Sequence, residues 1–273
     1  MSSRSLSVLL HTWKLASIMM LLSVIPVVVV ARWLGWWWTL PLIVYEIWIQ
    51  VKWWRNIKKE LVASLPEELD YEPMALEELP QDWDLKTLEE NSQKLRNMGF
   101  QHIRDIRLAE SCNNELTSFS RLFGHPQNFC FGELCLTEQS DQFSPLEMCS
   151  IHSTLTQGWS LSTTSIQICG LSYMWREPKV LCVCRPDTEL ADLLEDHLQR
   201  RQALVDYLHG QVVQDVSWEL YVHQQAESAK HRREIFKGKN IVWALWEATW
   251  FELHKKQEWM GDAARFFPEH KRH

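Results

Sequence analysis

Two apolar segments follow one another at the start of this chain of 273 residues. Residues 15–31 contain no charged side chain, and residues 33–54 contain seven of the sixteen tryptophans. A helix needs about 17–25 mainly apolar residues to cross a hydrocarbon core of about 30 Å. A cleavable signal peptide ends in a small-x-small site, whereas here a second apolar segment follows the first at once. We therefore expect residues 1–60 to be a retained membrane anchor.

Two arrangements of this anchor are compatible with the sequence. In the first, residues 15–31 and 34–51 form a transmembrane helical hairpin. In the second, a single span is followed by a helix that lies in the membrane interface. The hairpin is favoured, because residues 34–51 have hardly any polar face. Indole rings prefer the headgroup level, so the predicted membrane-interface residues are Trp36, Trp37, Trp38, Trp48, Trp53 and Trp54.

The charged residues around the second segment indicate its orientation. Glu46 is the one ionisable side chain of residues 34–51, and such a group within a membrane is costly unless it is paired or close to an interface. It precedes Lys52 by six residues, about 9 Å along a helix axis, which is close enough for Glu46 to lie near the membrane interface.

The orientation of the anchor follows from its basic residues. Cytoplasmic flanks attract Lys and Arg. We therefore expect an integral membrane protein with the bulk of the chain on the cytoplasmic side, because basic residues follow the anchor at Lys52, Arg55, Lys58 and Lys59.

Seven cysteines, an odd number, are spread over residues 112–184. A secreted disulfide framework more often has an even number, and reduced thiols agree with a cytoplasmic domain. Cys182 and Cys184 resemble half of a metal site, but no second closely spaced pair has zinc-finger spacing. The sequence therefore predicts no metal and no cofactor.

An acidic segment rich in proline follows the anchor. Residues 66–99 carry ten Asp and Glu against three Lys and Arg, and prolines occur at 66, 73 and 80. The prolines exclude one continuous helix, and the charge favours solvation. We expect residues 61–84 to be a linker or a wrapping arm. It would serve either as a spacer or as a docking strip for a basic partner or for the chain's own basic tract at residues 230–239.

The remaining residues, 85–273, are predicted to form a cytoplasmic α+β domain. Residues 85–98 have helical periodicity, and Gly99 is a natural stop. Helical periodicity returns after Pro186, with Asp187 as the predicted N-cap, and continues over roughly 214–236 and 241–253, so that helices occupy about 187–259. Between them the pattern is that of an antiparallel β-meander over about 101–184, with strand-like segments at 101–108, 116–123, 129–137, 146–155, 159–168 and 180–184.

A hydroxyl-rich hairpin is predicted at residues 153–165, where Ser and Thr take most outward positions. This face is a candidate site for a small polar substrate, with His125, His152 and Cys149 as weak catalytic candidates. Residues three apart on a strand face opposite sides of the sheet, which argues against a Cys149–His152 dyad. The sequence contains no G-x-S-x-G, P-loop, H-E-x-x-H or dinucleotide-binding motif.

A tryptophan stripe and a basic tract lie near the C-terminus. Residues 241–253 are too few and too polar to cross a bilayer, but such a helix can lie on anionic lipid. The favoured interpretation is that the tryptophans cover a face of the sheet, because this is the commoner use of an amphipathic helix. The candidate residues for binding lipid or a partner are Lys230, Arg232, Arg233, Lys237, Lys239, Trp243, Trp246 and Trp250.

The favoured function is a membrane-anchored interaction or assembly module with an unidentified protein partner and the lipid bilayer as its second partner. The alternatives are a membrane-tethered enzyme that acts at the Ser/Thr face and a domain that binds anionic lipid. Nucleic acid is not expected as a partner, because the chain is acidic, with 28 Lys and Arg against 35 Asp and Glu.

Overall fold

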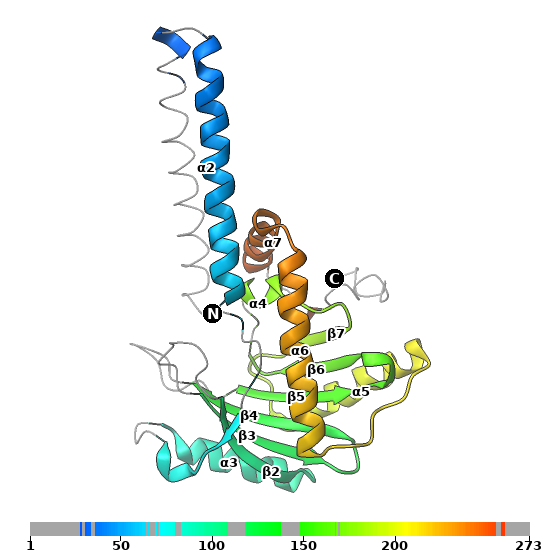
Figure 1. Cartoon of the computed structure of the whole chain (residues 1–273). Coiled ribbons are helices and arrows are strands. Elements are labelled where there is room, and N and C mark those ends of the chain that lie inside the picture. Colours follow the sequence, from blue (N-terminus) through cyan, green and yellow to red (C-terminus); the bar gives the residue numbers. More distant parts are fainter. Residues whose placement is uncertain are drawn as a thin grey trace. The chain divides into compact units, whose positions relative to one another are not determined.

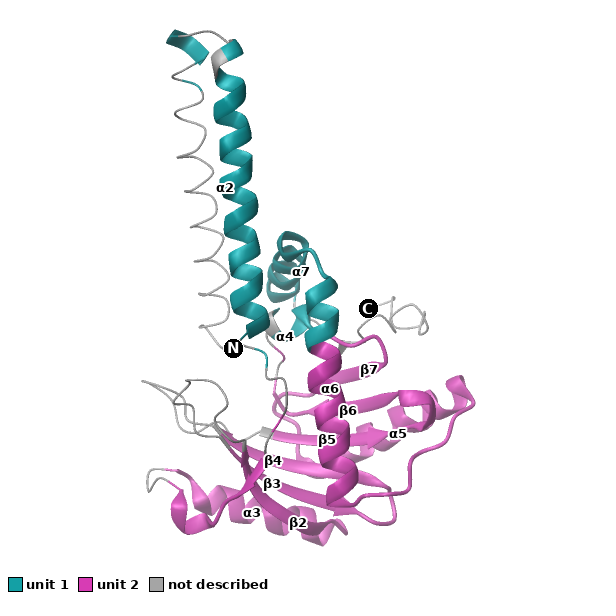
Figure 2. Ribbon diagram, viewed as in Figure 1, with its two compact units in different colours: residues 1–65, 169–175, 233–255 teal, residues 66–168, 176–232, 256–273 magenta. Residues whose placement is uncertain are grey.

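The computed structural model describes residues 28, 31–33, 36–63, 65, 69, 71–79, 83–108, 118–137, 148–166, 168, 170–254 and 258–259. The chain divides into two compact units, shown in teal and magenta in Figure 2. Unit 1 comprises residues 1–65, 169–175 and 233–255. Unit 2 comprises residues 66–168, 176–232 and 256–273.

Unit 2 is built on a mixed sheet whose strands lie in sequence order (Figure 1). This confirms the predicted α+β class, and the six strands expected from 101 onward are all present. The strands are β1 (Tyr71–Pro73), β2 (Gln101–Leu108), β3 (Ser118–His125), β4 (Cys130–Thr137), β5 (Met148–Thr154), β6 (Ser160–Thr164) and β7 (Val180–Cys184), with the two-residue β8 (Glu258–Trp259) beside β7.

The sheet departs from the predicted antiparallel meander at one pairing. Neighbouring strands from β1 to β6 are antiparallel, but β6 and β7 are parallel, with Ser162 opposite Cys182. Parallel neighbours require a crossover connection of a dozen or more residues. Residues 165–179 provide it and include the short helix α4 (Gly170–Met174). The fully antiparallel expectation was therefore wrong at this pairing.

Local signals explain most helix ends of unit 2. Helix α3 (Leu85–Asn97) begins after Asp84, whose carboxylate accepts a 3.0 Å hydrogen bond from the Thr87 amide. Gly99 follows with a φ of +95°. Helix α5 (Leu190–Leu208) begins later than predicted, because Asp187 adopts a φ of +59° in a turn and Glu189 takes the N-cap position. Helix α6 (Trp218–Gly238) begins in unit 2 and ends in unit 1.

The two faces of the sheet differ in polarity, because successive side chains of a strand alternate between them. One face packs against α3 and α5, in a core that includes Leu95, Phe119 and Leu193. The opposite face meets α6, where Tyr221 packs on Phe131. Apart from a smaller apolar cluster, this second face carries Ser, Thr, Cys, His and Glu side chains.

The acidic segment that we expected to be a linker contributes to the core of unit 2. Residues 71–73 form β1 against β2, and residues 76–78 form a 3-10 turn. Met74, Leu79 and Trp83 are buried in the core beside α3. Three well-spaced apolar side chains thus hold this proline-containing segment on the domain, while Glu77 and Glu78 are exposed.

Unit 1 is helical and contains α2 (Trp36–Ala63), α4, the last turns of α6 and α7 (Ile241–Leu253). Its core joins Ala244, Leu245 and Ala248 of α7 to Met174 and Phe236. Partly buried side chains from the C-terminal half of α2 pack against this cluster, namely Trp54, Ile57, Leu61 and Val62.

No helix within the described part of the chain is both long enough and apolar enough to cross a bilayer. The first predicted span, residues 15–31, lies almost entirely outside the described residues. Most of the second, residues 34–51, lies in α2 and does not meet the requirement, because tryptophans and Glu46 lower the apolar character of the helix. The second span of the predicted hairpin is therefore not supported.

Candidate lipid-contacting surface and polar sheet face

The N-terminal half of α2 exposes several large apolar side chains. Trp37 is 85% exposed, Val44 66% and Ile47 58%. Of the predicted interface tryptophans, Trp48 is also exposed, at 56%. Trp53 and Trp54 are partly buried and pack edge to face with ring centroids 4.7 Å apart. The side chains of Trp36 and Trp38 lie outside the described residues.

Charged groups adjoin the aromatic rings of α2. The Lys52 ammonium lies 5.2 Å from the centroid of the Trp48 ring, within the range of a cation–π interaction. Tyr45 stacks on the same ring at 6.1 Å. Glu46, the predicted intramembrane charge, is partly exposed on this part of the helix. The combination of indole rings and lysine is typical of the headgroup layer of a membrane.

Helix α7 presents its two sides differently. Ile241, Ala244 and Ala248 are buried within unit 1, whereas the tryptophan stripe, defined as Trp243, Trp246 and Trp250, is 62%, 50% and 55% exposed. Trp246 and Trp250 stack with centroids 6.4 Å apart. The favoured expectation, that these tryptophans are covered by packing on a face of the sheet, was therefore wrong. The helix packs through its small residues and leaves its large aromatic residues outside.

The basic tract does not form one free patch. In unit 1, the Arg233 guanidinium donates to the Leu65 carbonyl at 3.0 Å, and the Lys239 ammonium donates to the Met174 carbonyl at 2.7 Å. Lys237 is exposed. In unit 2, Lys230 is exposed and Arg232 lies 3.6 Å from the carboxylate of the buried Glu177. Arg232, Arg233 and Lys239 thus stabilise the fold locally.

Charge is strongly divided between the units. The sequence of unit 1 contains eleven Lys and Arg against five Asp and Glu, whereas that of unit 2 contains seventeen against thirty. The net charges are therefore +6 and −13. Unit 1, which carries the exposed aromatic surfaces, matches an anionic surface electrostatically, and unit 2 does not.

The polar face of the sheet brings three of its groups, Glu133, Ser150 and His152, close to Tyr221 of α6. The Tyr221 hydroxyl donates to the Glu133 carboxylate at 3.3 Å, and the His152 ring lies 3.8 Å from the same carboxylate. Ser150 lies 2.8 Å from His152 Nε2. Burial lowers the pKa of His152 and the Glu133 charge opposes this, while burial and Glu133 raise the pKa of Tyr221. A neutral imidazole and a protonated phenol stabilise this cluster as hydrogen-bonding groups.

The weak catalytic candidates are not brought together. His152 lies on the α6 face, whereas Cys149 is buried with Ile151 in the core on the opposite face. His125 is buried on that opposite face too, where its ring packs edge to face on Phe100. Burial lowers the pKa of His125. Among the described residues, no group of three or more His, Cys, Asp and Glu side chains is arranged to hold a metal ion.

The Ser/Thr positions of the predicted hairpin are divided between the two faces. Ser153 and Thr163 face α5, where their hydroxyls lie 2.8 and 2.9 Å from the two ring nitrogens of His197. The Thr154 hydroxyl faces α6 and donates to the Gln224 side-chain oxygen at 2.9 Å. Ser153 and Thr163 are thus used within the fold, whereas Ser160, Ser162 and Thr164 share the α6 face with Thr154 through the pairing of β6 with β5.

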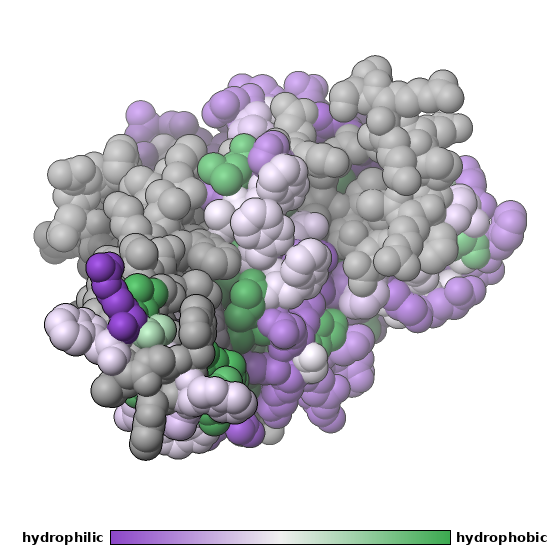
Figure 3. Space-filling model, turned by 90° about the horizontal axis from the view of Figure 1, so that it is seen from above, coloured by the Kyte–Doolittle hydropathy of each residue, from purple (hydrophilic) through white to green (hydrophobic). Residues whose placement is uncertain are grey.

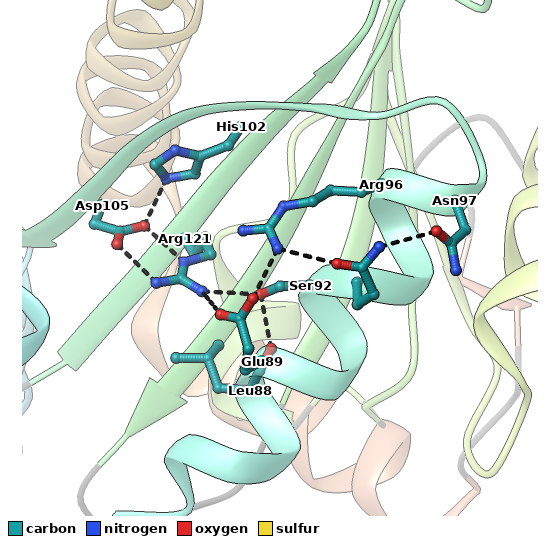
Figure 4. A network of polar contacts seen from close by, with 9 residues as sticks. Leu88, Glu89, Ser92, Arg96, Asn97, His102, Asp105 and Arg121 are labelled. Carbon is teal, nitrogen blue, oxygen red and sulfur yellow. Dashed lines mark hydrogen bonds and ion pairs between the residues drawn. The ribbon is translucent and has the colours of Figure 1, made fainter.

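Sequence reasoning missed a buried ion network between α3 and the sheet (Figure 4). The Arg121 side chain, 4% exposed, contacts Asp105 on β2 and both Glu89 and Ser92 on α3. The signal that could have revealed it is the position of Arg121 between Phe119 and Phe123, both fully buried. Alternate residues of a strand share a face, so Arg121 lies on the same apolar face as the two phenylalanines. A charged side chain buried on that face requires partners.

Comparisons with protein-family models, with curated proteins and with solved structures returned no significant match to this chain. Function is therefore inferred below from the chemistry of its own surfaces.

Proposed function

We propose that this protein is a membrane-associated interaction module, in which unit 1 contacts the bilayer and unit 2 binds another protein on the cytoplasmic side. The observation that carries the proposal is the exposure of large apolar side chains along α2, with Trp37 at 85% and Val44 at 66%. Soluble monomers rarely expose large contiguous apolar surfaces unless these bind a membrane or a partner.

The chemistry of the α2 surface favours lipid as its occupant. Tryptophan concentrates where one side of the ring is apolar and the other is wet, which is the headgroup level of a bilayer. Lys52 and Arg55 are exposed on the same helix, and unit 1 has the positive balance that anionic lipid attracts. The exposed apolar residues of α2 that we assign to this contact are Trp37, Leu40, Val44, Tyr45, Ile47, Trp48 and Val51.

Residues 15–31 are proposed to supply the span that holds the chain in the membrane, with α2 beside it at the interface. This is the arrangement of one span followed by an interfacial helix. Their uncharged length reaches the lower limit for crossing a bilayer.

The proposed partner of unit 2 is a protein with a basic surface. Thirty Asp and Glu against seventeen Lys and Arg give this unit a field that repels anionic lipid and steers cationic partners toward it. Glu77 and Glu78 are exposed side by side on the segment between β1 and α3. We propose these two glutamates as part of the surface that binds such a partner.

Membrane association is tested with the full chain expressed in cells. Membranes are washed with high salt and then with alkaline carbonate, and the chain is followed by immunoblotting. We expect it to stay in the pellet through both washes and to be released by detergent. Recovery of the full chain as a monodisperse species without detergent or vesicles contradicts the proposal.

The protein partner is tested by chemical crosslinking in membranes, followed by purification in mild detergent and mass spectrometry. We expect one stoichiometric partner, which is lost when Glu77 and Glu78 are both changed to Lys. Changing the exposed Glu195 and Glu227 of the same unit to Lys makes the same change of charge elsewhere on the surface, is the matched control and should leave the yield unchanged. A chain recovered alone in every sample contradicts the interaction role.

A further inference from the structure

We infer that α7 makes a second membrane contact, in which the tryptophan stripe lies in the headgroup layer of a leaflet containing anionic lipid. This inference rests on the proposed function, because α7 meets lipid only if unit 1 is at a bilayer. It goes beyond the anchor, since α7 follows α2 by almost 180 residues and contacts lipid through its own surface.

The orientation of α7 is determined by the side that packs. Ala244 and Ala248 are buried, and α4 approaches α7 so closely that a Cβ at Gly170 would lie 2.5 Å from the Ala248 carbonyl oxygen. Only a side with small residues permits this approach. The tryptophans, spaced by three and four residues, then occupy the opposite side of the helix.

The start of α7 is held in place by hydrogen bonds. The Asn240 side chain caps the helix by accepting from the Val242 and Trp243 amides at 3.0 and 3.3 Å. The Lys58 ammonium of α2 donates to the carbonyls of Lys237 and Lys239 at 2.5 and 2.7 Å. Unit 1 therefore presents the tryptophan stripe in a fixed orientation, which lowers the entropic cost of binding a surface.

Three observations favour a lipid interface as the occupant of this stripe. The exposed residues are mainly indoles, and the Trp243 Nε1 donates to the Glu247 carboxylate at 3.1 Å, so its polar atom is satisfied while its ring faces outward. Lys237 is exposed in the last turn of α6, shortly before α7 begins. Finally, the +6 charge of unit 1 complements anionic headgroups.

The dimensions of α7 indicate that it lies on the bilayer and does not cross it. It has thirteen residues and contains Glu247 and Glu252, whereas a span needs about twenty mainly apolar residues. Val242 and Leu253 are exposed beside the stripe and extend its apolar contact. Seen from above, the described surface shows green and pale side chains among the hydrophilic ones instead of a continuous hydrophilic shell (Figure 3).

The experiment places a photoreactive benzoylphenylalanine at one position at a time in the full chain. The positions are Trp246 on α7, Ile47 on α2 and Tyr207 on α5, all exposed. Each protein is reconstituted into phosphatidylcholine vesicles with or without phosphatidylserine and irradiated. Mass spectrometry then identifies lipid or protein adducts, and circular dichroism verifies the fold. Because each replaced side chain is exposed, none of these variants removes core packing.

We expect lipid adducts at positions 246 and 47 and none at 207. Adducts at 47 without adducts at 246 overturn the inference and leave membrane association intact. Absence of lipid adducts at both positions overturns the inference and the proposed membrane contact of α2 together. Protein adducts at 246 in place of lipid adducts assign the stripe to a protein interface and also overturn the inference.

Dependence on lipid charge is tested with the same reporter at position 246. Including phosphatidylserine should raise the adduct yield about fivefold for each lysine near the surface. Lys237→Glu should lower the yield in these vesicles, whereas Lys230→Glu, which changes an exposed lysine of unit 2, should not. Equal yields with and without phosphatidylserine overturn the anionic preference.

Discussion

The Arg121 guanidinium donates two hydrogen bonds, both of 2.9 Å, to the two carboxylate oxygens of Asp105 on the adjacent strand (Figure 4). Arg121 also reaches Glu89 of α3 at 2.9 Å. Burial raises the pKa of Asp105, but hydrogen bonds from Arg121 and His102 outweigh it and hold that pKa below its ordinary value. The pair therefore joins β2 to β3, and Arg121 connects both strands to α3 through Glu89 and Ser92.

Removing one partner of this pair should be more destabilising than removing both. We expect Asp105→Leu to lower the free energy of unfolding by about 3–5 kcal/mol, because it leaves the buried Arg121 without its bidentate acceptor. The double variant Asp105→Leu with Arg121→Met should be more stable than that single variant. Urea unfolding of the detergent-solubilised chain measures both. Glu89→Gln is the control, with a cost below about 1 kcal/mol because Glu89 is 56% exposed. If the losses in the free energy of unfolding of the two single variants add up in the double variant, the two residues are not coupled.

His197 should make the sheet unit less stable at acidic pH. The imidazole is fully buried between the Ser153 and Thr163 hydroxyls, and burial lowers its pKa from 6.5 to about 3. The unfolded chain therefore binds a proton that the folded chain does not, so this contribution to stability is complete above pH 6.5 and is lost as the pH falls toward 3. We expect a loss of about 2 kcal/mol between pH 6.5 and pH 5.

His197→Leu should remove this pH dependence while costing about 1–3 kcal/mol at neutral pH, since Thr163 loses its imidazole partner and Ser153 keeps only the Arg201 guanidinium, at 3.2 Å. His223→Gln is the control, because His223 is 68% exposed. Urea unfolding at several pH values measures these effects. An unchanged acid slope in the His197→Leu variant would show that His197 is not its source.

The cysteines of the sheet should resist alkylation in the folded protein. Burial raises the pKa of Cys130 to about 12 and that of Cys135 to about 11, so almost no thiolate exists at neutral pH. A hydrogen bond with Cys184 and burial raise the pKa of Cys182. Pulse labelling with N-ethylmaleimide, followed by unfolding and a second isotopic label, should find the first label absent from Cys130, Cys135, Cys149, Cys182 and Cys184.

Denaturant should make all five thiols reactive within the same pulse, which serves as the control. Rapid labelling of any one of them in the folded protein would mean that its strand opens or that the thiol is more accessible than the structure shows.

Gly170 should be indispensable for the packing of α7 in unit 1. Its amide donates to the Glu252 carboxylate at 2.7 Å, and an added Cβ would lie 2.5 Å from the Ala248 carbonyl oxygen. We expect Gly170→Ala to cost about 1–3 kcal/mol through overpacking and to raise amide hydrogen exchange in residues 241–253. Gly238→Ala is the control, because a Cβ there meets no atom within 4 Å. Similar exchange in both variants would refute the close packing.

Features that depend on neighbours in the chain could be predicted from the sequence. Helix α7 occupies residues 241–253 as expected, and α3 ends before Gly99 as expected. Strands β2 to β7 lie within about two residues of most predicted bounds. The aromatic candidates for a lipid contact were also named from the sequence, because clustered tryptophan beside lysine is a local signal. What occupies that surface remains a proposal.

The sequence by itself determined where helices and strands form, since helical and strand periodicities are properties of contiguous residues. Only the tertiary structure decided the parallel pairing of β6 with β7 and the pairing of Arg121 with Asp105, sixteen residues away. It also decided which side of α7 is buried. Both sides of that helix are apolar, so hydrophobicity does not distinguish them. The close approach of Gly170 to Ala248 selects the side with small residues and leaves the tryptophans exposed.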